Sequence, residues 1–117
     1  MSKLSPHFSR SEFACKCRNC SFDTVDIELI QLAENIRSKI GAFTPNSASR
    51  CSAHNKNIGG SKKSQHLLGK AMDVPSKKPK ELYDWLNDQY PNKFGLGLYS
   101  TFVHVDVRTE KSRWKKL

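Results

Sequence analysis

Apolar residues recur at helical spacing in two stretches of the chain, and each stretch predicts an amphipathic helix. The first covers residues 26–41, where one face carries Leu29, Leu32, Ala33, Ile36 and Ile40. Asp26 is suited to cap the start of this helix, and Gly41 is suited to end it. The second covers residues 78–90, where one face carries Leu82, Trp85, Leu86 and Tyr90. These two are the main helices that we expect.

Alternation with a period of two predicts strands nearer the C-terminus. Residues 94–99 and 102–108 read as two strands joined by a tight turn. Along the second strand one side carries Val103, Val105 and Val107, and the other side carries Phe102, His104, Asp106 and Arg108. Residues 42–50 are also compatible with a strand, although Pro45 confines them to an edge or a strand end. We therefore predict an α+β fold, with a short antiparallel sheet packed against two main helices.

The length of 117 residues suits one small domain, and no repeat or linker divides the chain. Within it we expect an irregular, cysteine-containing arm over residues 1–24 and a basic tail over residues 109–117. No stretch approaches the roughly 20 apolar residues of a membrane span, and residues 1–8 lack the apolar core of a signal peptide. We expect a monomer that is made in the cytoplasm and needs outside help to leave it.

The charge balance favours acidic partners. Twenty Lys and Arg against eleven Asp and Glu give a net charge of +9, which suits nucleic acid, anionic lipid or an acidic bacterial envelope. Charge alone does not choose among these, and a solvated basic face is the plain alternative.

Two segments together offer ligands for a metal ion. On the strand 102–108, His104 and Asp106 point the same way from a strand whose other face is apolar, which by itself could be an ordinary surface pair. Upstream, His66 and Asp73 stand seven residues apart, with the small residues Gly69 and Ala71 between them. Two imidazoles and one carboxylate form a three-ligand set for zinc that leaves the fourth position for water. Such a site lowers the pKa of that water toward about 7 and polarises a carbonyl group.

These residues carry a family resemblance. The pattern Ser64-x-His66-x-x-Gly69-x-Ala71-x-Asp73, followed by Phe102-Val-His104-Val-Asp106, resembles the zinc D-Ala-D-Ala carboxypeptidase family, which is grouped with lysostaphin-type peptidases and the hedgehog signalling domain. Residues 46–55 and Gly59-Gly60 also look like the family's upstream segment. The resemblance implies that His66, Asp73 and His104 are zinc ligands. It also implies that Arg50 contacts the substrate carboxylate or the developing oxyanion and that Ser64 lines the site.

Arg50 has some support from its chemistry as well, because a guanidinium holds a carboxylate in a two-bonded fork and peptidoglycan stems are rich in carboxylates. An ordinary salt bridge is the alternative.

The chain departs from the family at one position. Many relatives carry Glu or Asp three residues before the last histidine ligand, as a general base, and this chain has Thr101 there. A threonine cannot accept a proton at neutral pH. Three interpretations stay open: Asp106 serves as base or orients a ligand, zinc-bound hydroxide attacks with less help, or the domain binds zinc without catalysis.

Four cysteines form a separate group whose state the sequence leaves open. They could hold a structural zinc ion, form two disulfides or remain free thiols. They are Cys15, Cys17, Cys20 and Cys51.

The leading functional expectation is a zinc metallopeptidase that hydrolyses peptide bonds in peptidoglycan stem peptides, as a carboxypeptidase or an endopeptidase. The small size and positive charge suit a phage-type lysis enzyme (an endolysin) or a virion-borne wall hydrolase, which would reach the wall after release or delivery by a particle. The alternatives are a zinc-binding module without catalysis and a basic nucleic-acid-binding protein. Nucleic acid is the less favoured partner, because the cysteine cluster lacks the histidine and interleaved aromatic residues of a zinc knuckle.

Overall fold

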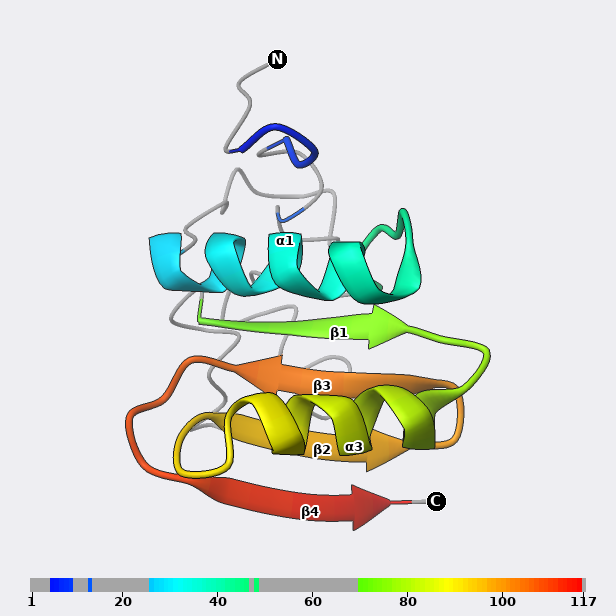
Figure 1. Ribbon diagram of the computed structural model, residues 1–117, viewed down its shortest axis with the longest axis vertical. Coiled ribbons are helices and arrows are strands. Elements are labelled where there is room, and N and C mark those ends of the chain that lie inside the picture. The colour runs from blue at the N-terminus through cyan, green and yellow to red at the C-terminus, as the bar shows by residue number, and fades with distance from the viewer. Residues whose placement is uncertain (1–4, 10–12, 14–25, 47, 49–69, 117) are drawn as a thin grey trace, which may run out of the picture.

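The computed structural model describes residues 5–9, 13, 26–46, 48 and 70–116. Within these residues two helices and one four-stranded sheet make an α+β domain, as predicted. The helices are α1 (Ile27–Ile40) and α3 (Pro79–Gln89). The strands are β1 (Ala71–Pro75), β2 (Gly95–Tyr99), β3 (Phe102–Asp106) and β4 (Ser112–Lys116), and they lie side by side in the order β1-β3-β2-β4 (Figure 1).

Both helices lie where the apolar spacing predicts them. The Asp26 side chain accepts a hydrogen bond from the Glu28 backbone N–H at 2.8 Å and so caps α1. Gly41 ends α1 with φ at 91°, a backbone conformation that favours glycine, and its N–H donates to the Arg37 carbonyl. Pro79 occupies the first turn of α3, where its missing N–H costs no hydrogen bond. Neither helix is long and apolar enough to cross a membrane.

The sheet is mixed and not purely antiparallel, which corrects the prediction. β3 pairs antiparallel with both β1 and β2, but β4 runs parallel to β2. Residues 112–116 of the expected basic tail are therefore a strand. The described residues between 42 and 48 form no strand, although the Asn46 backbone N–H donates to the Asp73 carbonyl on β1 at 2.8 Å.

One face of the sheet packs against the helices and makes the core. The sheet contributes Met72, Val74, Leu96, Leu98, Val103 and Val105, and the helices contribute Leu29, Leu32, Ala33, Ile36, Leu82 and Leu86. All of these side chains are buried, so the alternation along β3 and the spacing along both helices identify core positions correctly. The alternate positions of the strands project from the opposite face of the sheet.

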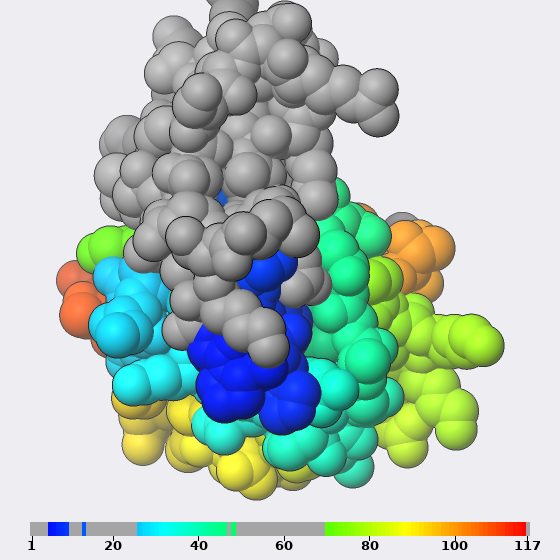
Figure 2. Space-filling model, turned by 90° about the horizontal axis from the view of Figure 1, so that it is seen from above, coloured from blue at the N-terminus to red at the C-terminus, as the bar shows by residue number. Residues whose placement is uncertain are grey.

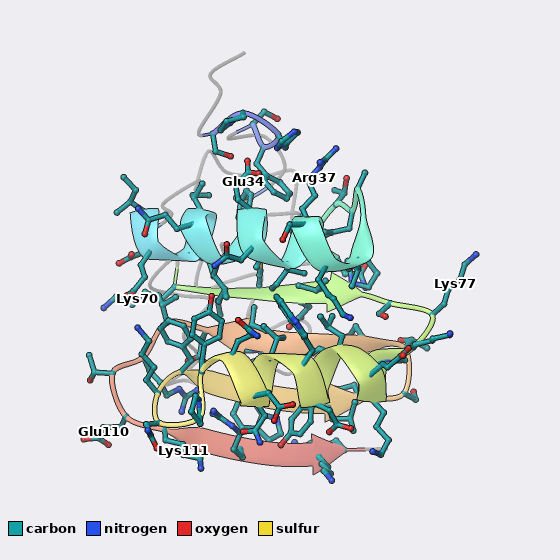
Figure 3. The ribbon with its side chains drawn as sticks, in the orientation of Figure 1. Glu34, Arg37, Lys70, Lys77, Glu110 and Lys111 are labelled. Atoms are coloured by element: carbon teal, nitrogen blue, oxygen red, sulfur yellow. The ribbon has the colours of Figure 1, made fainter. Side chains whose placement is uncertain are left out.

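The described part of the N-terminal arm lies against α1, as the space-filling view shows (Figure 2). Phe8 and Phe13 are buried, and the Phe8 ring packs on Phe13 and Phe43 with centroid distances of 5.7 and 5.3 Å. Glu34 points from α1 toward the arm (Figure 3) and accepts hydrogen bonds from the Ser5 hydroxyl and the His7 backbone N–H. Its other oxygen lies 2.7 Å from His7 Nδ1. The arm is therefore tied to the domain by apolar and polar contacts.

Candidate metal centre

Four residues form one row across the sheet on the face opposite the helices. Asp73 on β1 pairs with His104 on β3, His104 pairs with Gly97 on β2, and Gly97 pairs with Trp114 on β4. Register partners in neighbouring strands project from the same face. The fold thus brings together Asp73 and His104, two of the three residues that the sequence predicts as metal ligands, although 31 positions separate them in the chain.

The imidazole of His104 lies between two carboxylates. Its Nδ1 is 3.2 Å from Asp73 Oδ1, and its Nε2 is 2.7 Å from Asp106 Oδ2. Asp73 and His104 are each less than a tenth exposed, and Asp106 is fully buried. His104 and Asp106 are therefore not an ordinary surface pair, because both side chains are buried. Charged groups buried this deeply need partners, and each of these side chains has one.

Asp106 is surrounded by N–H donors. Arg108 donates from Nε to Oδ1 and from Nη2 to Oδ2, both at 2.7 Å, which is the two-bonded fork that arginine makes with a carboxylate. The backbone N–H of Gly95 donates to Oδ1 at 3.1 Å. These contacts direct the Asp106 carboxylate at His104 Nε2 and Arg108, an arrangement that suits an orienting residue better than a base that must collect a proton from water.

The two partners shift each other's pKa. Burial raises the pKa of Asp106, but the hydrogen bonds from His104 and Arg108 outweigh it and hold that pKa far below its ordinary range. Asp106 is therefore ionised, and in the hydrogen bond between the two side chains His104 Nε2–H donates to Asp106 Oδ2. Burial lowers the pKa of His104, but the hydrogen bonds to Asp106 and Asp73 outweigh it, so the net direction is upward.

The donor set at Asp73 and His104 fits a divalent metal ion. With the proton on Nε2 fixed by Asp106, the lone pair of a neutral imidazole belongs to Nδ1, which is the nitrogen nearest the Asp73 carboxylate. One imidazole nitrogen and one carboxylate oxygen at this separation match two of the ligand types that zinc takes. The described residues alone hold no group of three metal-binding side chains. The predicted third ligand, His66, lies outside the described residues, as do Arg50, Ser64 and the four cysteines.

Thr101 occupies the exposed turn between β2 and β3, three residues before His104. Its carbonyl accepts a hydrogen bond from the Ser76 backbone N–H at 3.2 Å. Thr101 therefore lies in a turn, and the position at which many relatives carry an acidic general base holds no carboxylate in this chain.

Sequence reasoning missed two glycines and a tryptophan that shape this face. A Cβ atom at Gly95 would lie 2.4 Å from Asp106 Oδ2, and a Cβ atom at Gly97 would lie 2.4 Å from the Trp114 indole. Gly95 therefore leaves room for the Asp106 carboxylate, and Gly97 leaves room for the Trp114 indole, where these side chains cross β2. The signal was the pair of glycines two apart inside a strand, Gly95-Leu-Gly97, because glycine in a strand interior often marks a close approach.

A comparison with protein families bears on the whole arrangement. The family model described as Peptidase M15 matches residues 6–106. The chain belongs to the Peptidase M15 family. The match confirms the resemblance to zinc D-Ala-D-Ala carboxypeptidases, and it includes Asp73, His104 and Asp106. It ends before Arg108 and β4, so part of what surrounds His104 lies beyond the range that the family model matches. No curated protein matches the chain.

Proposed function

We propose that this Peptidase M15 domain is a zinc peptidase that hydrolyses peptide bonds in the stem peptides of bacterial peptidoglycan. The observation that carries the proposal is the pairing of Asp73 with His104 Nδ1, while Asp106 holds the other nitrogen of the same imidazole. An imidazole fixed in this way is prepared to bind a metal ion through one nitrogen only.

The chain supplies three ligands in this proposal: His66, Asp73 and His104. When bound, zinc supplies a Lewis acid that polarises the scissile carbonyl and makes water a nucleophile near neutral pH. The protein's own contribution is orientation. Asp106 holds the His104 ring and is itself held by Arg108, and the backbone pairing of β1 with β3 holds Asp73 beside His104.

Arg50 and Ser64 are proposed to bind the substrate. A guanidinium can hold a stem-peptide carboxylate in a two-bonded fork or stabilise negative charge that develops on the attacked carbonyl. The net charge of +9 favours association with an acidic cell envelope and raises the local concentration of the enzyme there. Both features suit a negatively charged, carboxylate-rich polymer.

We also propose that the protein acts as a phage-type wall hydrolase, released during lysis or delivered by a virion. The net charge of +9 supports this role, because it favours binding to an acidic cell wall.

A zinc-binding module without catalysis is the second candidate, and Thr101 is the observation that favours it. No carboxylate occurs in the chain between Asp88 and Asp106, so a base of the usual family type is missing from the segment before His104. Asp106 does not replace it easily, because both of its oxygens accept hydrogen bonds from N–H groups.

The decisive experiment combines metal analysis with a wall digest. Purified protein, with its cysteines alkylated, should hold one zinc ion, and His66→Ala, Asp73→Ala and His104→Ala should each lose it. His7→Ala serves as the matched control, because His7 is exposed and its ring pairs with Glu34 on α1 and not with a residue of this row. Zinc in all three ligand variants at the level of the parent would show that the ligand assignment is wrong.

The zinc-loaded protein is then incubated with purified peptidoglycan, and the products are identified by mass spectrometry. New peptide termini that disappear with chelator, and with His104→Ala, support the peptidase. Full zinc occupancy with no cleavage of peptidoglycan or of D-Ala-D-Ala peptides would instead select the module without catalysis. The masses of the products also distinguish carboxypeptidase from endopeptidase cleavage.

A further inference from the structure

Trp114 lies in the same row as Asp73 and His104, on a strand that the sequence did not predict. β4 pairs parallel with β2, and this register puts Trp114 opposite Gly97, whose other partner is His104. Gly97 has no side chain to stand between its two neighbours. The indole therefore spans β2 and reaches His104, with ring centroids 5.0 Å apart and planes inclined by 48°.

The indole is itself held in place. Its Nε1–H donates to the Tyr99 hydroxyl at 3.2 Å, and the Tyr99 ring is stacked on Phe102 with centroids 4.4 Å apart. The Arg108 guanidinium lies 5.5 Å from the centre of the Trp114 ring, within the range of a cation–π contact. Trp114 thus contacts both His104 and the arginine that grips Asp106.

We propose that Trp114 is a positioning residue for the metal ligand His104. Asp106 determines which nitrogen of the imidazole carries the proton, and packing against the side of the ring determines its tilt. The indole fills the side of the ring toward β2 and limits that tilt, so that Nδ1 stays beside Asp73. Aromatic rings at about 4.5–7 Å between centroids attract each other in tilted arrangements, which favours the same position.

This inference rests on the proposed function, because it assumes that His104 binds metal. It adds a residue from outside the range that the family model matches, since that range ends at Asp106. It also gives a reason for Gly97: any side chain there would occupy the space of the indole. A substitution at Gly97 should therefore act on the metal centre through Trp114.

The test uses the full chain with its cysteines alkylated and Co²⁺ as the probe for the zinc position. Trp85→Phe leaves Trp114 as the only tryptophan, because the chain has two. Co²⁺ absorbs visible and near-ultraviolet light and quenches nearby indole emission, so titration with Co²⁺ should strongly quench Trp114. Chelator should restore the emission, and His104→Ala in the same background should abolish the quenching. This arm leaves Trp114 intact and does not depend on how well a Trp114 variant folds.

Three variants then test positioning. Trp114→Ala should weaken Zn²⁺ binding by roughly 10-fold, at the low end of the loss seen when outer partners of metal ligands are removed, and should alter the Co²⁺ absorption spectrum. Trp114→Phe should restore most of the Zn²⁺ affinity and most of the parent's Co²⁺ spectrum, since an aromatic ring again packs on His104. Gly97→Ala should reproduce the Trp114→Ala spectrum, whereas Lys116→Ala, an exposed position on the same strand, should match the parent.

Three outcomes separate failure of this inference from failure of the proposed function. If the parent binds Co²⁺ no better than His104→Ala does, the metal centre is wrong and the positioning role is lost with it. If the parent binds Co²⁺ through His104 but the emission of Trp114 is unchanged, Trp114 is not beside the metal and the inference is overturned. The inference is also overturned if Trp114→Ala keeps the parent's Zn²⁺ affinity and Co²⁺ spectrum, and in both of these cases the proposed function stands.

Discussion

Replacing Asp106 by asparagine changes one atom in a fully buried carboxylate and tests what that carboxylate does. Asparagine has the shape of aspartate but carries an NH₂ group in place of one oxygen. In the parent, Oδ2 accepts from His104 Nε2 and Arg108 Nη2, and Oδ1 accepts from Arg108 Nε and the Gly95 backbone N–H. Whichever way the amide turns, its NH₂ group faces N–H donors and gives them no acceptor.

The expected cost follows from burial. Removing one partner of a buried ion pair costs about 3–5 kcal/mol, because the remaining charge loses its compensation. The Arg108 side chain is 32% exposed and can recover solvation, so we expect a loss near the lower end, about 3 kcal/mol of unfolding free energy. For the metal, loss of the group that orients His104 should weaken zinc binding roughly 10- to 100-fold, which is about 1.4–2.7 kcal/mol.

The assay compares the parent, Asp106→Asn and a matched control, Asp84→Asn. Asp84 also pairs with a cation, Lys80 at 2.9 Å, but both side chains are more than half exposed. The control should therefore change the unfolding free energy by no more than about 0.5 kcal/mol. Urea titrations without metal give the stability, and competition with a chromophoric chelator gives the zinc affinity.

The reasoning is refuted by a specific pair of results. An Asp106→Asn protein that binds zinc as tightly as the parent but no longer cleaves peptidoglycan would make Asp106 the general base and not an orienting residue. A variant that keeps both the parent's zinc affinity and its cleavage of peptidoglycan would show that the contacts around Asp106 do not matter for the metal centre.

Three further predictions address other parts of the chain. Arg50→Ala should keep zinc and stability but lower kcat/KM by about 100-fold or more, with Arg50→Lys only partly active; normal turnover would leave Arg50 a purely structural residue. Partial burial raises the pKa of Glu34, but hydrogen bonds from Ser5 and His7 outweigh it and hold that pKa below its ordinary value of 4.5. The stability that Glu34 supplies is thus fully present above pH 4.5 and is lost as the pH falls through the lower folded-state value. Glu34→Gln should cost about 0.5–1.5 kcal/mol near neutral pH and less in acid, and an equal cost in urea titrations at both pH values would contradict this. A structural zinc on the cysteines should give two zinc ions per chain, one of them lost on thiol modification, whereas a mass four hydrogens lighter than the reduced chain would establish two disulfides; the residues are Cys15, Cys17, Cys20 and Cys51.

Local patterns in the sequence determined much of this protein. The start and end of α1 follow from Asp26 and Gly41, whose capping depends only on their immediate neighbours. The three valines after Phe102 identify a strand with one face in the core, because side chains alternate with a period of two. The family match confirms what the spacing of Ser64, His66 and Asp73 indicated about the class of protein.

Only the tertiary structure decided that β4 and its Trp114 lie beside His104. Residues 112–116 carry three cations and show no apolar alternation, so their sequence reads as a tail. They form β4 because Arg113 donates hydrogen bonds to the carbonyls of Tyr90 and Phe94 and to Asn87, and because Gly97 leaves room for Trp114. A strand stabilised by contacts about 15 to 26 residues away in the chain carries no local signal, since the partners that stabilise it become neighbours only when the chain folds.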